Sequence, residues 1–442
     1  MTQQTPKSGT SGVIRVGILG CGNVGSALVG LINSNRDIID GRSGVKLEIV
    51  RVAVRETTKD RGNEILPNVL TTDTVGLVND PNVDVVVELI GGIEPARTLI
   101  LSALKLGKPV ITGNKELLAS AGAELFEAAE AAGVDLLFEA SVAGGIPLIR
   151  PLRESLAGER IKRVIGIVNG TTNFILTSMT EDATSFADAL AEAQRLGFAE
   201  ADPTADVEGF DAAAKSAIIA SIAFGAQVVA SDVYREGITQ VTASDISAAR
   251  DLGYVIKLLA VAEAVGEGEN SSLAARVHPV MVPANHPLAS VRGSFNAVFV
   301  QGDAIGDLML YGRGAGGNPT AVAVLGDLID AAKNLHSGAR GATIGKLIDK
   351  PIVPIDDVRS QYYLTLDVAD QPGVLAAIAG VFGKHMVSIQ SMQQKGEASE
   401  AHLIFVTHLA WEADMMATIS EVKDLAVVTR VGSFVRVIGE EA

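Results

Sequence analysis

One short stretch near the amino end limits the fold of this chain more than any other. Val13–Leu19 is an apolar run rich in β-branched residues, and an apolar-periodic stretch extending to Leu31 follows after a glycine-rich turn. This pattern predicts a strand, a tight turn and a helix. The turn has G-x-G-x-x-G spacing, which is typical of dinucleotide-binding sites in that setting. Its candidate cofactor-binding residues are Gly20, Gly22, Asn23, Val24 and Gly25.

Glycines in such a turn let the backbone approach a pyrophosphate, and the N–H groups at the helix start favour its negative charge. The alternative is an ordinary strand–helix turn without a ligand. Farther on, Val83–Ile90 is a nearly continuous apolar run, as expected for a strand covered on both faces of a parallel sheet. We therefore expect an α/β fold whose first domain is a Rossmann-type parallel sheet that binds NAD or NADP.

The net charge of the chain argues against some classes of binding partner, and its length indicates how many domains it can form. Its 442 residues include 36 basic and 52 acidic side chains, which gives a formal net charge of −16. So acidic a surface repels phosphate backbones and anionic lipids, and we expect neither nucleic acid nor membrane as a partner. The length is sufficient for about two to four domains.

The single cysteine, Cys21, excludes an internal disulfide and a multi-thiolate zinc site, which is consistent with a reducing cytoplasm. It is a poor candidate for a catalytic thiol, because it lies inside the turn that a cofactor would cover. No apolar run reaches the ~18–20 residues that a membrane span requires. The polar first residues lack the apolar core of a signal peptide, so we expect a cytoplasmic protein with a disordered amino end.

The expected second strand, about Leu47–Val54, should end where the cofactor ribose is bound. NAD-specific folds usually have an acid at this point, but this chain has Arg55, with Lys59 and Arg61 shortly after it. These basic residues suit the additional phosphate of NADP. Because Glu56 follows Arg55 directly, a mixed solvent-exposed loop is the alternative.

Two further segments follow predicted strands at the edge where open α/β sheets bind ligands. Lys115 comes shortly after the strand Lys108–Thr112, and we expect it to contact cofactor or substrate rather than solvent alone. Glu139 follows the strand Val134–Phe138 and begins a run of small residues that extends to Pro147. A carboxylate with several turn carbonyls resembles an all-oxygen cation site. A tight crossover between two domains explains the same spacing equally well.

The pattern changes at about residue 151, where a second domain should begin. A strand runs into the polar turn Asn169–Asn173, in which Gly170 is a candidate cofactor contact. Much later, the glycine-rich segment Tyr311–Thr320 precedes a periodic helix, so Gly316 is a further candidate at a helix start. Because no clear strand precedes this segment, we interpret it as a loop that returns to the cofactor cleft.

The stretch Ala193–Lys215 contains several acids and one lysine between mostly apolar flanks. We expect its acids to converge on Lys215, and they are Glu200, Asp202, Asp206, Glu208 and Asp211. Asp211 and Lys215 are four residues apart, on one face of a helix expected from about Asp206 onward. The break at Asp202-Pro203 places Glu200 on a loop ahead of that helix.

Two carboxylates beside one ammonium group can hold a substrate amine and leave the lysine to move a proton. The alternative is a solvated surface ion pair between Asp211 and Lys215, worth ~0.3–0.5 kcal/mol.

The last part of the chain has a pattern of its own. Pro351–Pro354 resembles a linker, and the segment from Tyr362 to Ile438 then reads β-α-β-β-α-β. This order predicts a ferredoxin-like domain and resembles the ACT domain, a small module that commonly binds an amino acid. A dimerisation module without ligand is the alternative, because a fold alone does not determine a function.

The residue order of the acid-rich stretch resembles the signature of the homoserine dehydrogenase family. The matching positions are Ala193, Gly197-Phe198, Asp202-Pro203, Asp206-Val207, Gly209, Asp211 and Lys215. So long and mixed a pattern has a small false-positive risk. The resemblance implies NAD(P)-dependent interconversion of L-homoserine and L-aspartate 4-semialdehyde, in threonine, methionine and isoleucine biosynthesis.

The resemblance also implies roles for individual residues. Lys215 would donate and accept the proton at the substrate oxygen, and Lys115 would reach substrate or cofactor. Glu200 and Asp211 would hold the substrate amino group, with Asp206 and Gly197 beside them and Gly197 also near the cofactor. Sodium would be held by Glu139, Val142, Gly144 and Ile146, the last three through their carbonyls.

By the same analogy, threonine would inhibit the enzyme through the ACT domain, and the chain would form a homodimer or homotetramer. The tail departs from the family at His385–Ile389, which lacks the asparagine often seen before the second ACT strand. A rival enzyme, aspartate-semialdehyde dehydrogenase, needs a thiolate nucleophile that this chain does not supply. A non-catalytic NADP sensor with an amino-acid-binding ACT module is the alternative of another class, and it leaves the acid–lysine arrangement unexplained.

These patterns together predict the domain boundaries. They are a disordered segment 1–12, a Rossmann domain 13–150, an α+β substrate-binding, catalytic and dimerisation domain 151–310, a return segment 311–350 that completes the cofactor domain, a linker 351–360 and an ACT regulatory domain 361–442.

Overall fold

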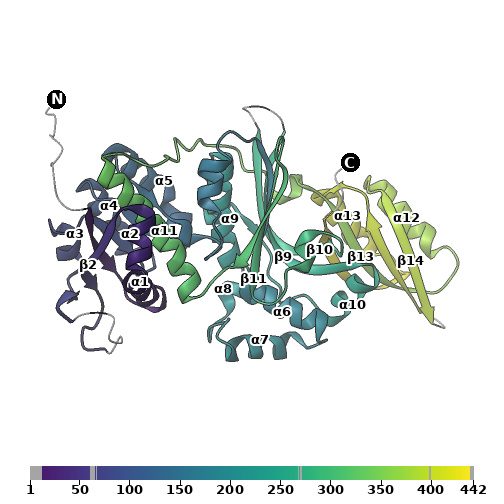
Figure 1. Ribbon diagram of the computed structural model, residues 1–442. Helices are drawn as coiled ribbons and strands as arrows, with labels where there is room; N and C mark the ends of the chain where they lie inside the picture. Colours follow the sequence, from purple (N-terminus) through teal and green to yellow (C-terminus); the bar gives the residue numbers. More distant parts are fainter. Residues whose placement is uncertain are drawn as a thin grey trace. The chain divides into compact units, whose positions relative to one another are not determined.

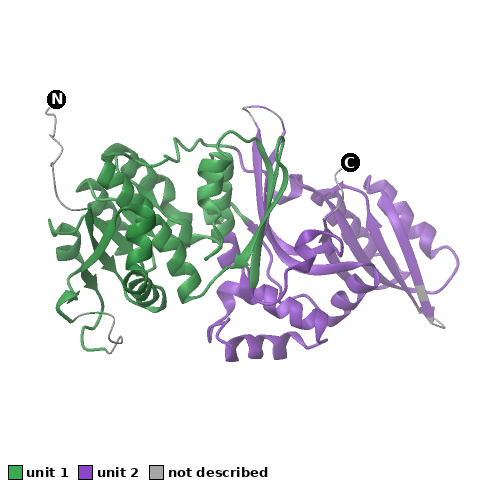
Figure 2. Cartoon of the chain, in the orientation of Figure 1, with its two compact units in different colours: residues 1–164, 214–233, 295–350 green, residues 165–213, 234–294, 351–442 purple. Residues whose placement is uncertain are grey.

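The computed structural model describes residues 12–438, except 60–64, 66, 267, 269–270 and 398–399. The chain forms two compact units, each built from three segments (Figure 2). The first unit comprises residues 1–164, 214–233 and 295–350, and the second comprises 165–213, 234–294 and 351–442. The predicted disordered segment lies outside the described residues except for Gly12, and so does Arg61 of the predicted basic tip.

The first unit contains a parallel sheet with the strand order β3-β2-β1-β4-β5-β6. The strands are β1 (Val13–Leu19), β2 (Lys46–Ala53), β3 (Leu70–Thr71), β4 (Val85–Glu88), β5 (Val110–Thr112) and β6 (Leu136–Leu137). This order is that of a dinucleotide-binding fold and confirms the predicted Rossmann-type sheet. Strand β4 is shorter than predicted because the Glu88 carboxylate accepts hydrogen bonds from the N–H groups of Ile90 and Gly91, which turns the chain out of the sheet.

Helices pack against this sheet, and one of them comes from far along the chain. They are α1 (Asn23–Ser34), α2 (Arg36–Ser43), α3 (Thr74–Asn79), α4 (Ala96–Lys105), α5 (Lys115–Ala132) and α11 (Gly317–Ser337). Helix α11 lies beside α1 (Figure 1). Val324 and Leu328 of α11 share one buried core with Val16 of β1 and Leu28 of α1. Burial of this apolar face attaches α11 to the nucleotide fold.

A hairpin of β11 (Phe295–Gly302) and β12 (Gly306–Arg313) leads into α11. The prediction that no clear strand precedes the glycine-rich return segment was therefore wrong, because β12 includes its first residues. The strand was hard to recognise because it is mostly half-buried or exposed, and only four consecutive apolar residues lie between its glycines at positions 306 and 312. Short helical turns at Pro67–Val69, Glu139–Ser141 and Pro151–Ser155 complete this part of the first unit.

Two elements continue from one unit into the other, namely β7 (Ile161–Ile167) and α9 (Phe210–Phe224). The second unit also contains α6 (Gly170–Glu181), α7 (Phe186–Arg195), α8 (Thr204–Val207) and α10 (Ala243–Asp251). Its first strands are β8 (Tyr234–Arg235), β9 (Tyr254–Val265) and β10 (Ser272–Pro283). Strand β10 pairs antiparallel with β9 along its whole length and parallel with β8.

The helix expected from about Asp206 begins later. A single turn, α8, ends at Val207, and α9 starts at Phe210. Gly209 lies between them with φ +79°, a left-handed conformation that ends one helix before the next begins. Asp211 and Lys215 nevertheless lie on the same helix, one turn apart, as predicted.

The tail has the predicted β-α-β-β-α-β order. Its elements are β13 (Arg359–Ala369), α12 (Val374–Lys384), β14 (Ile389–Glu397), β15 (Glu400–Thr407), the short β16 (Ala410–Trp411), α13 (Glu412–Lys423) and β17 (Val428–Val437). The order β17-β13-β15-β14 confirms the ferredoxin-like sheet. Both helices pack on a core that includes Tyr362, Ile378, Phe405 and Met415.

This tail is not loosely connected to the rest of the second unit. Strand β17 pairs parallel with β10, with Arg436 opposite Val280. The predicted linker is also fixed, because the Leu273 N–H donates to the Pro351 carbonyl and the Val353 N–H donates to the Leu273 carbonyl, each at 2.9 Å. No helix in the described part of the chain is long and apolar enough to cross a membrane.

Candidate active site

The glycine turn after β1 has the shape that close approach to a ligand requires. Gly20 has φ +98°, and a Cβ there would lie 2.7 Å from the Leu89 carbonyl oxygen. A Cβ on Gly25 would lie 2.5 Å from the Gly20 carbonyl oxygen, so this glycine lets α1 pack against the turn. A Cβ on Gly22 would meet nothing within 4 Å. Gly22 and Asn23 are exposed at the start of α1, and Gly22 provides no side-chain cap there, which fits a pyrophosphate.

Lys115 lies beyond the carboxyl ends of β4 and β5, at the edge of the sheet where the glycine turn also lies. The buried Glu88 carboxylate accepts a hydrogen bond of 2.6 Å from Thr112, and Thr112 accepts one of 3.0 Å from the Asn114 N–H. The Asn114 side chain then caps α5 by accepting from the Leu117 N–H. Lys115 is consequently the first residue of a helix whose start is fixed and buried.

The basic tip follows β2. Arg55 and Lys59 are both exposed, just beyond the carboxyl end of that strand. This is the end of the sheet at which the glycine turn also lies, since β1 and β2 are parallel. The position of these two residues suits the phosphate of NADP.

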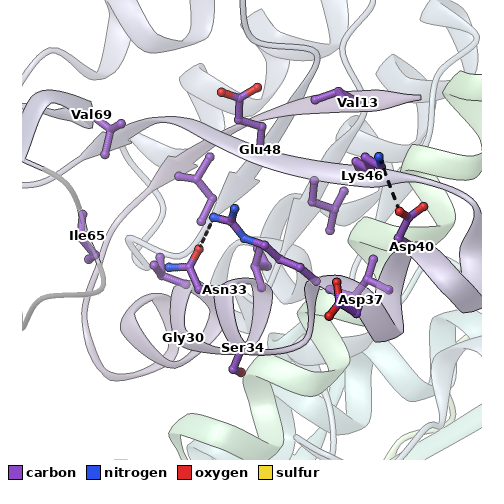
Figure 3. A pocket seen from close by; sticks show the side chains of 16 residues that line it. Val13, Gly30, Asn33, Ser34, Asp37, Asp40, Lys46, Glu48, Ile65 and Val69 are labelled. Atoms are coloured by element: carbon purple, nitrogen blue, oxygen red, sulfur yellow. Dashed lines mark hydrogen bonds and ion pairs between the residues drawn. The ribbon is translucent and has the colours of Figure 1, made fainter. Parts of the chain in front are cut away.

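A cavity of about 1050 Å³ in the first unit does not coincide with this edge (Figure 3). It is lined by Val13 at the start of β1, by Lys46 and Glu48 in β2, and by Asn33 near the end of α1. Val13, Lys46 and Glu48 lie toward the amino ends of these two strands, whereas the glycine turn lies at the carboxyl end of β1. The cavity is therefore not the cofactor cleft.

The acid-rich stretch is organised by an asparagine. The Asn169 side-chain amide donates hydrogen bonds to the carboxylates of Asp206, at 2.6 Å, and Asp211, at 2.9 Å. Asp211 and Lys215 are buried, with 8% and 9% of their surface exposed. A solvated surface ion pair is thus excluded, because both charged groups are largely removed from water.

The other acids of the stretch have different environments. The Asp202 carboxylate accepts a hydrogen bond of 3.1 Å from the Thr204 N–H, and the Glu208 carboxylate accepts one of 3.0 Å from the Thr239 hydroxyl. Glu200 lies on an exposed loop ahead of α8, as does Gly197, which has φ +77°. Asp206 and Asp211 are therefore the two acids that share a partner.

Asn169 was predicted only as part of a polar turn that contacts the cofactor, with Gly170 next to it. This turn is the start of α6. There the side-chain oxygen of Asn169 accepts a hydrogen bond of 2.8 Å from the Thr172 N–H. The sequence signal for a functional role of Asn169 was its position just after β7, at a strand's carboxyl end. Its partners Asp206 and Asp211 lie far along the chain, so no local pattern could predict these hydrogen bonds.

A buried lysine supports the same turn. Lys257 on β9 donates hydrogen bonds to the Asn173 side chain at 2.9 Å and to the Val291 carbonyl at 2.6 Å. Burial lowers the pKa of Lys257 to about 8. No sequence pattern singles out this residue, because it lies within an ordinary apolar strand.

The predicted cation site begins at a carboxylate that is already occupied. Glu139 accepts hydrogen bonds from the N–H groups of Leu148, Ile149 and Arg150, at 2.5, 2.8 and 2.8 Å. Its own N–H donates to Asp327 at 2.8 Å. Burial and the nearby Glu139 raise the pKa of Asp327 to about 7, although Arg150 forms an ion pair with it at 2.8 Å.

The carbonyls proposed for that site belong to a turn with left-handed backbone at Ala143 and Gly144. Val142, Gly144 and Ile146 are all buried. Gly144 is close to the return segment, since a Cβ there would lie 2.4 Å from the Gly314 carbonyl oxygen. Gly316, two residues farther on, is the N-cap of α11. Among the described residues, no group of three His, Cys, Asp or Glu side chains is placed to hold a metal ion.

Comparison with protein families matches three parts of the chain. Residues 20–139 match the NAD-binding domain of homoserine dehydrogenase, residues 147–329 match homoserine dehydrogenase, and residues 362–427 match the ACT domain. These matches confirm the predicted resemblance, including that of the tail. They also support a nicotinamide cofactor.

Individual relatives are similar over nearly the whole chain. The homoserine dehydrogenase of Mycobacterium tuberculosis is 50% identical over 433 residues, which cover 96% of this chain and 98% of that protein. A crystal structure of a homoserine dehydrogenase from Thiobacillus denitrificans is 43% identical and has a TM-score of 0.89, with 96% of this chain and 98% of that chain covered.

A structure of a hyperthermophilic archaeal homoserine dehydrogenase in complex with NADPH is 29% identical with a TM-score of 0.59, covering 72% of this chain and 97% of that one. The family models and the full-length relatives point to one family, and the glycine turn and the buried Asp211 and Lys215 are consistent with it. This chain belongs to the homoserine dehydrogenase family of oxidoreductases.

Proposed function

We propose that the protein interconverts L-homoserine and L-aspartate 4-semialdehyde with a nicotinamide cofactor. The observation that carries this proposal is the burial of Asp211 and Lys215 on one helix, with Asn169 bonded to Asp211 and to Asp206. Charged groups at a buried position interact with a bound ligand more strongly than they would in water. A substrate that carries both an amino group and a reacting oxygen suits such a set.

Lys215 is proposed as the group that takes the hydroxyl proton when homoserine is oxidised and returns it when the semialdehyde is reduced. The nicotinamide, when bound, accepts or supplies the hydride at the substrate carbon that carries this oxygen. Asp211 and the loop residue Glu200 hold the substrate amino group, while Asp206 and Gly197 border the substrate. Lys115, at the start of α5, reaches substrate or cofactor.

The cofactor contacts are proposed at the glycine turn, from Gly20 to Gly25, and at the helix starts of Gly170 and Gly316. Their support is the exposed start of α1 and the open space at Gly22. Arg55 and Lys59 favour NADP over NAD because they add positive charge at the end of β2.

A sodium ion is proposed at the turn after β6. The Glu139 carboxylate is engaged by three backbone N–H groups, so we assign the contact to its main-chain carbonyl, with those of Val142, Gly144 and Ile146. Neutral carbonyl oxygens suit a monovalent cation, which needs less negative charge from its ligands than a divalent one.

The ACT domain is proposed to bind an amino-acid effector, with threonine as a feedback inhibitor. We further propose a homodimer or homotetramer in the cytoplasm, with a place in threonine, methionine and isoleucine biosynthesis. Inhibition of homoserine oxidation by added threonine, and not by added alanine, tests the effector assignment.

The reaction is tested by incubating the purified protein with homoserine and NADP and following NADPH absorbance. Reduction of NADP that depends on homoserine supports the dehydrogenase. If the protein binds NADPH but homoserine produces no reduction, the alternative of a non-catalytic NADP sensor is favoured instead.

A further inference from the structure

Arg436, near the end of the chain, lies buried between two carboxylates from different parts of the second unit. Its guanidinium contacts Glu412 at 2.5 and 2.9 Å and Glu236 at 2.9 Å, and the side chain is only 3% exposed. It also lies over the Tyr234 ring, 5.5 Å from the centroid. A charge this deeply buried is tolerated because both carboxylates pair with it.

The two carboxylates belong to different structural elements. Glu412 begins α13 inside the ACT domain and accepts a hydrogen bond of 2.8 Å from Tyr362 in β13. Glu236 directly follows β8, outside the ACT domain, and its carboxylate accepts a hydrogen bond from Tyr234. Arg436 therefore links the ACT domain to the segment after β8 through two ion pairs, next to the place where β17 pairs with β10.

The β8 segment, Tyr234–Thr239, in turn holds the residues that precede α9. The Ile238 N–H donates to the Val207 carbonyl at 2.8 Å, and the Thr239 hydroxyl donates to the Glu208 carboxylate at 3.0 Å. The Arg235 guanidinium lies over the Phe210 ring, 3.4 Å from its centroid.

The packing between these two segments leaves little space. A Cβ on Gly237 would lie 2.3 Å from the Val207 carbonyl oxygen. A Cβ on Gly209 would lie 3.4 Å from the Glu236 carbonyl oxygen. The Glu236 backbone is thus packed against the turn that ends in Phe210, and Asp211 is the next residue.

We propose that Arg436 is a positioning residue for the substrate site. By holding Glu236 against the ACT domain, it fixes the β8 segment, and this segment sets the turn from which α9 presents Asp211 and then Lys215. A conformational change in the ACT domain that shifts β17 would therefore also shift the positions of Asp206 and Asp211, through these contacts. The proposal rests on the proposed dehydrogenase function for its kinetic readout only.

The test compares Arg436→Lys with Arg430→Lys as a matched control. Arg430 lies on the same strand but pairs with Asp367 inside the ACT domain, with 69% of its side chain exposed. A lysine at 436 is a point charge that cannot bridge two carboxylates as the planar guanidinium does.

For Arg436→Lys we expect kcat/KM for homoserine to fall about tenfold, a typical coupling for residues in one charged network. The KM for NADP should stay within about twofold of the wild-type value, since the glycine turn is untouched. Arg430→Lys should leave both unchanged. Adding Glu236→Gln to Arg436→Lys should cause no further loss, because both changes break the same connection.

A readout independent of catalysis is hydrogen exchange of the Val207–Phe210 amides in the substrate-free protein. We expect faster exchange in Arg436→Lys, and in Glu236→Gln alone should the first variant fold poorly, but not in Arg430→Lys. Unchanged exchange in both variants would overturn the proposal, as would equal kinetic losses for homoserine and NADP. Absence of homoserine oxidation in the wild type would reject the proposed function while the exchange result still decides the coupling.

Discussion

The side-chain nitrogen of Asn169 lies 2.9 Å from a carboxylate oxygen of Asp211. One residue thus joins the turn after β7 to the helix that carries Lys215. The same amide donates to Asp206 at 2.6 Å, so two acids that would otherwise repel each other share one donor group. The Asn169 side chain thus holds Asp206 and Asp211 together at the site where we propose that the substrate binds.

Replacing Asn169 by Asp should disable this arrangement while preserving the helix start. Aspartate still accepts from the Thr172 N–H, but it adds a third carboxylate where Asp206 and Asp211 need a donor. Loss of two hydrogen bonds to charged groups predicts a fall in kcat/KM for homoserine of roughly tenfold to hundredfold, measured by NADPH formation. Asn169→Ala, which loses the cap as well, should unfold at lower temperature. Wild-type kinetics in Asn169→Asp would contradict the assignment.

Two glycines of the cofactor turn should respond differently to the same substitution. Gly25→Ala places its Cβ 2.5 Å from the Gly20 carbonyl, which should reduce both stability, by about 1–3 kcal/mol, and NADPH affinity. Gly22→Ala meets nothing within 4 Å, so stability should change by less than about 1 kcal/mol. NADPH affinity should still fall, because the methyl group occupies the pyrophosphate space. Thermal unfolding and NADPH fluorescence titration measure the two effects. Equal affinity of Gly22→Ala and the wild type would argue against this binding surface.

Arg55→Ala should weaken the use of NADP specifically. Loss of one charge-assisted contact to a phosphate predicts a decrease in kcat/KM for NADP of about tenfold, with little effect on NAD. Arg51→Ala serves as the control, because Arg51 lies on β2, four residues before Arg55, but pairs with Asp80 at 2.9 Å. Equal losses with both cofactors would mean that Arg55 does not contact the distinguishing phosphate.

The buried Lys257 predicts a dependence of stability on pH. Its pKa is about 8 in the folded protein and about 10.5 when exposed. Between these values the unfolded chain holds the proton and the folded protein does not, so stability rises with pH. Comparison with Lys257→Met removes contributions from other groups. The stability of the wild type relative to the variant should increase by about 2 kcal/mol from pH 8 to pH 10, measured by urea unfolding. A constant difference across this range would show that the lysine titrates normally.

Local patterns predicted the parts of this protein that depend on neighbouring residues. The strand Val13–Leu19 was placed correctly because a mostly apolar, β-branched run ends at a glycine, and the tail was recognised because each element has its own period. Helix α9 was placed too early, since Gly209 adopts a left-handed conformation that composition does not reveal. The half-exposed strand β12 was missed for a similar reason.

Contacts between distant residues had no such signal. Asn169 with Asp211, Lys257 with Asn173, and Arg436 with Glu236 each join segments that are far apart in the chain. In each pair, neither residue type nor spacing identifies the partner, because the fold alone brings them together. The Glu139 carboxylate illustrates the same limit, since its backbone partners follow only from the path of the chain.

Lys215 is proposed to transfer the proton at the substrate oxygen, so its replacement by alanine should remove this step. Lys215→Ala should reduce kcat for homoserine oxidation by about 10²–10⁴, the contribution typical of a general acid–base group. Its affinity for NADPH should stay near that of the wild type, and the exposed Lys346→Ala should behave as wild type in both assays. If Lys215→Ala binds NADPH and still oxidises homoserine at the wild-type rate, Lys215 is not the proton-transfer group.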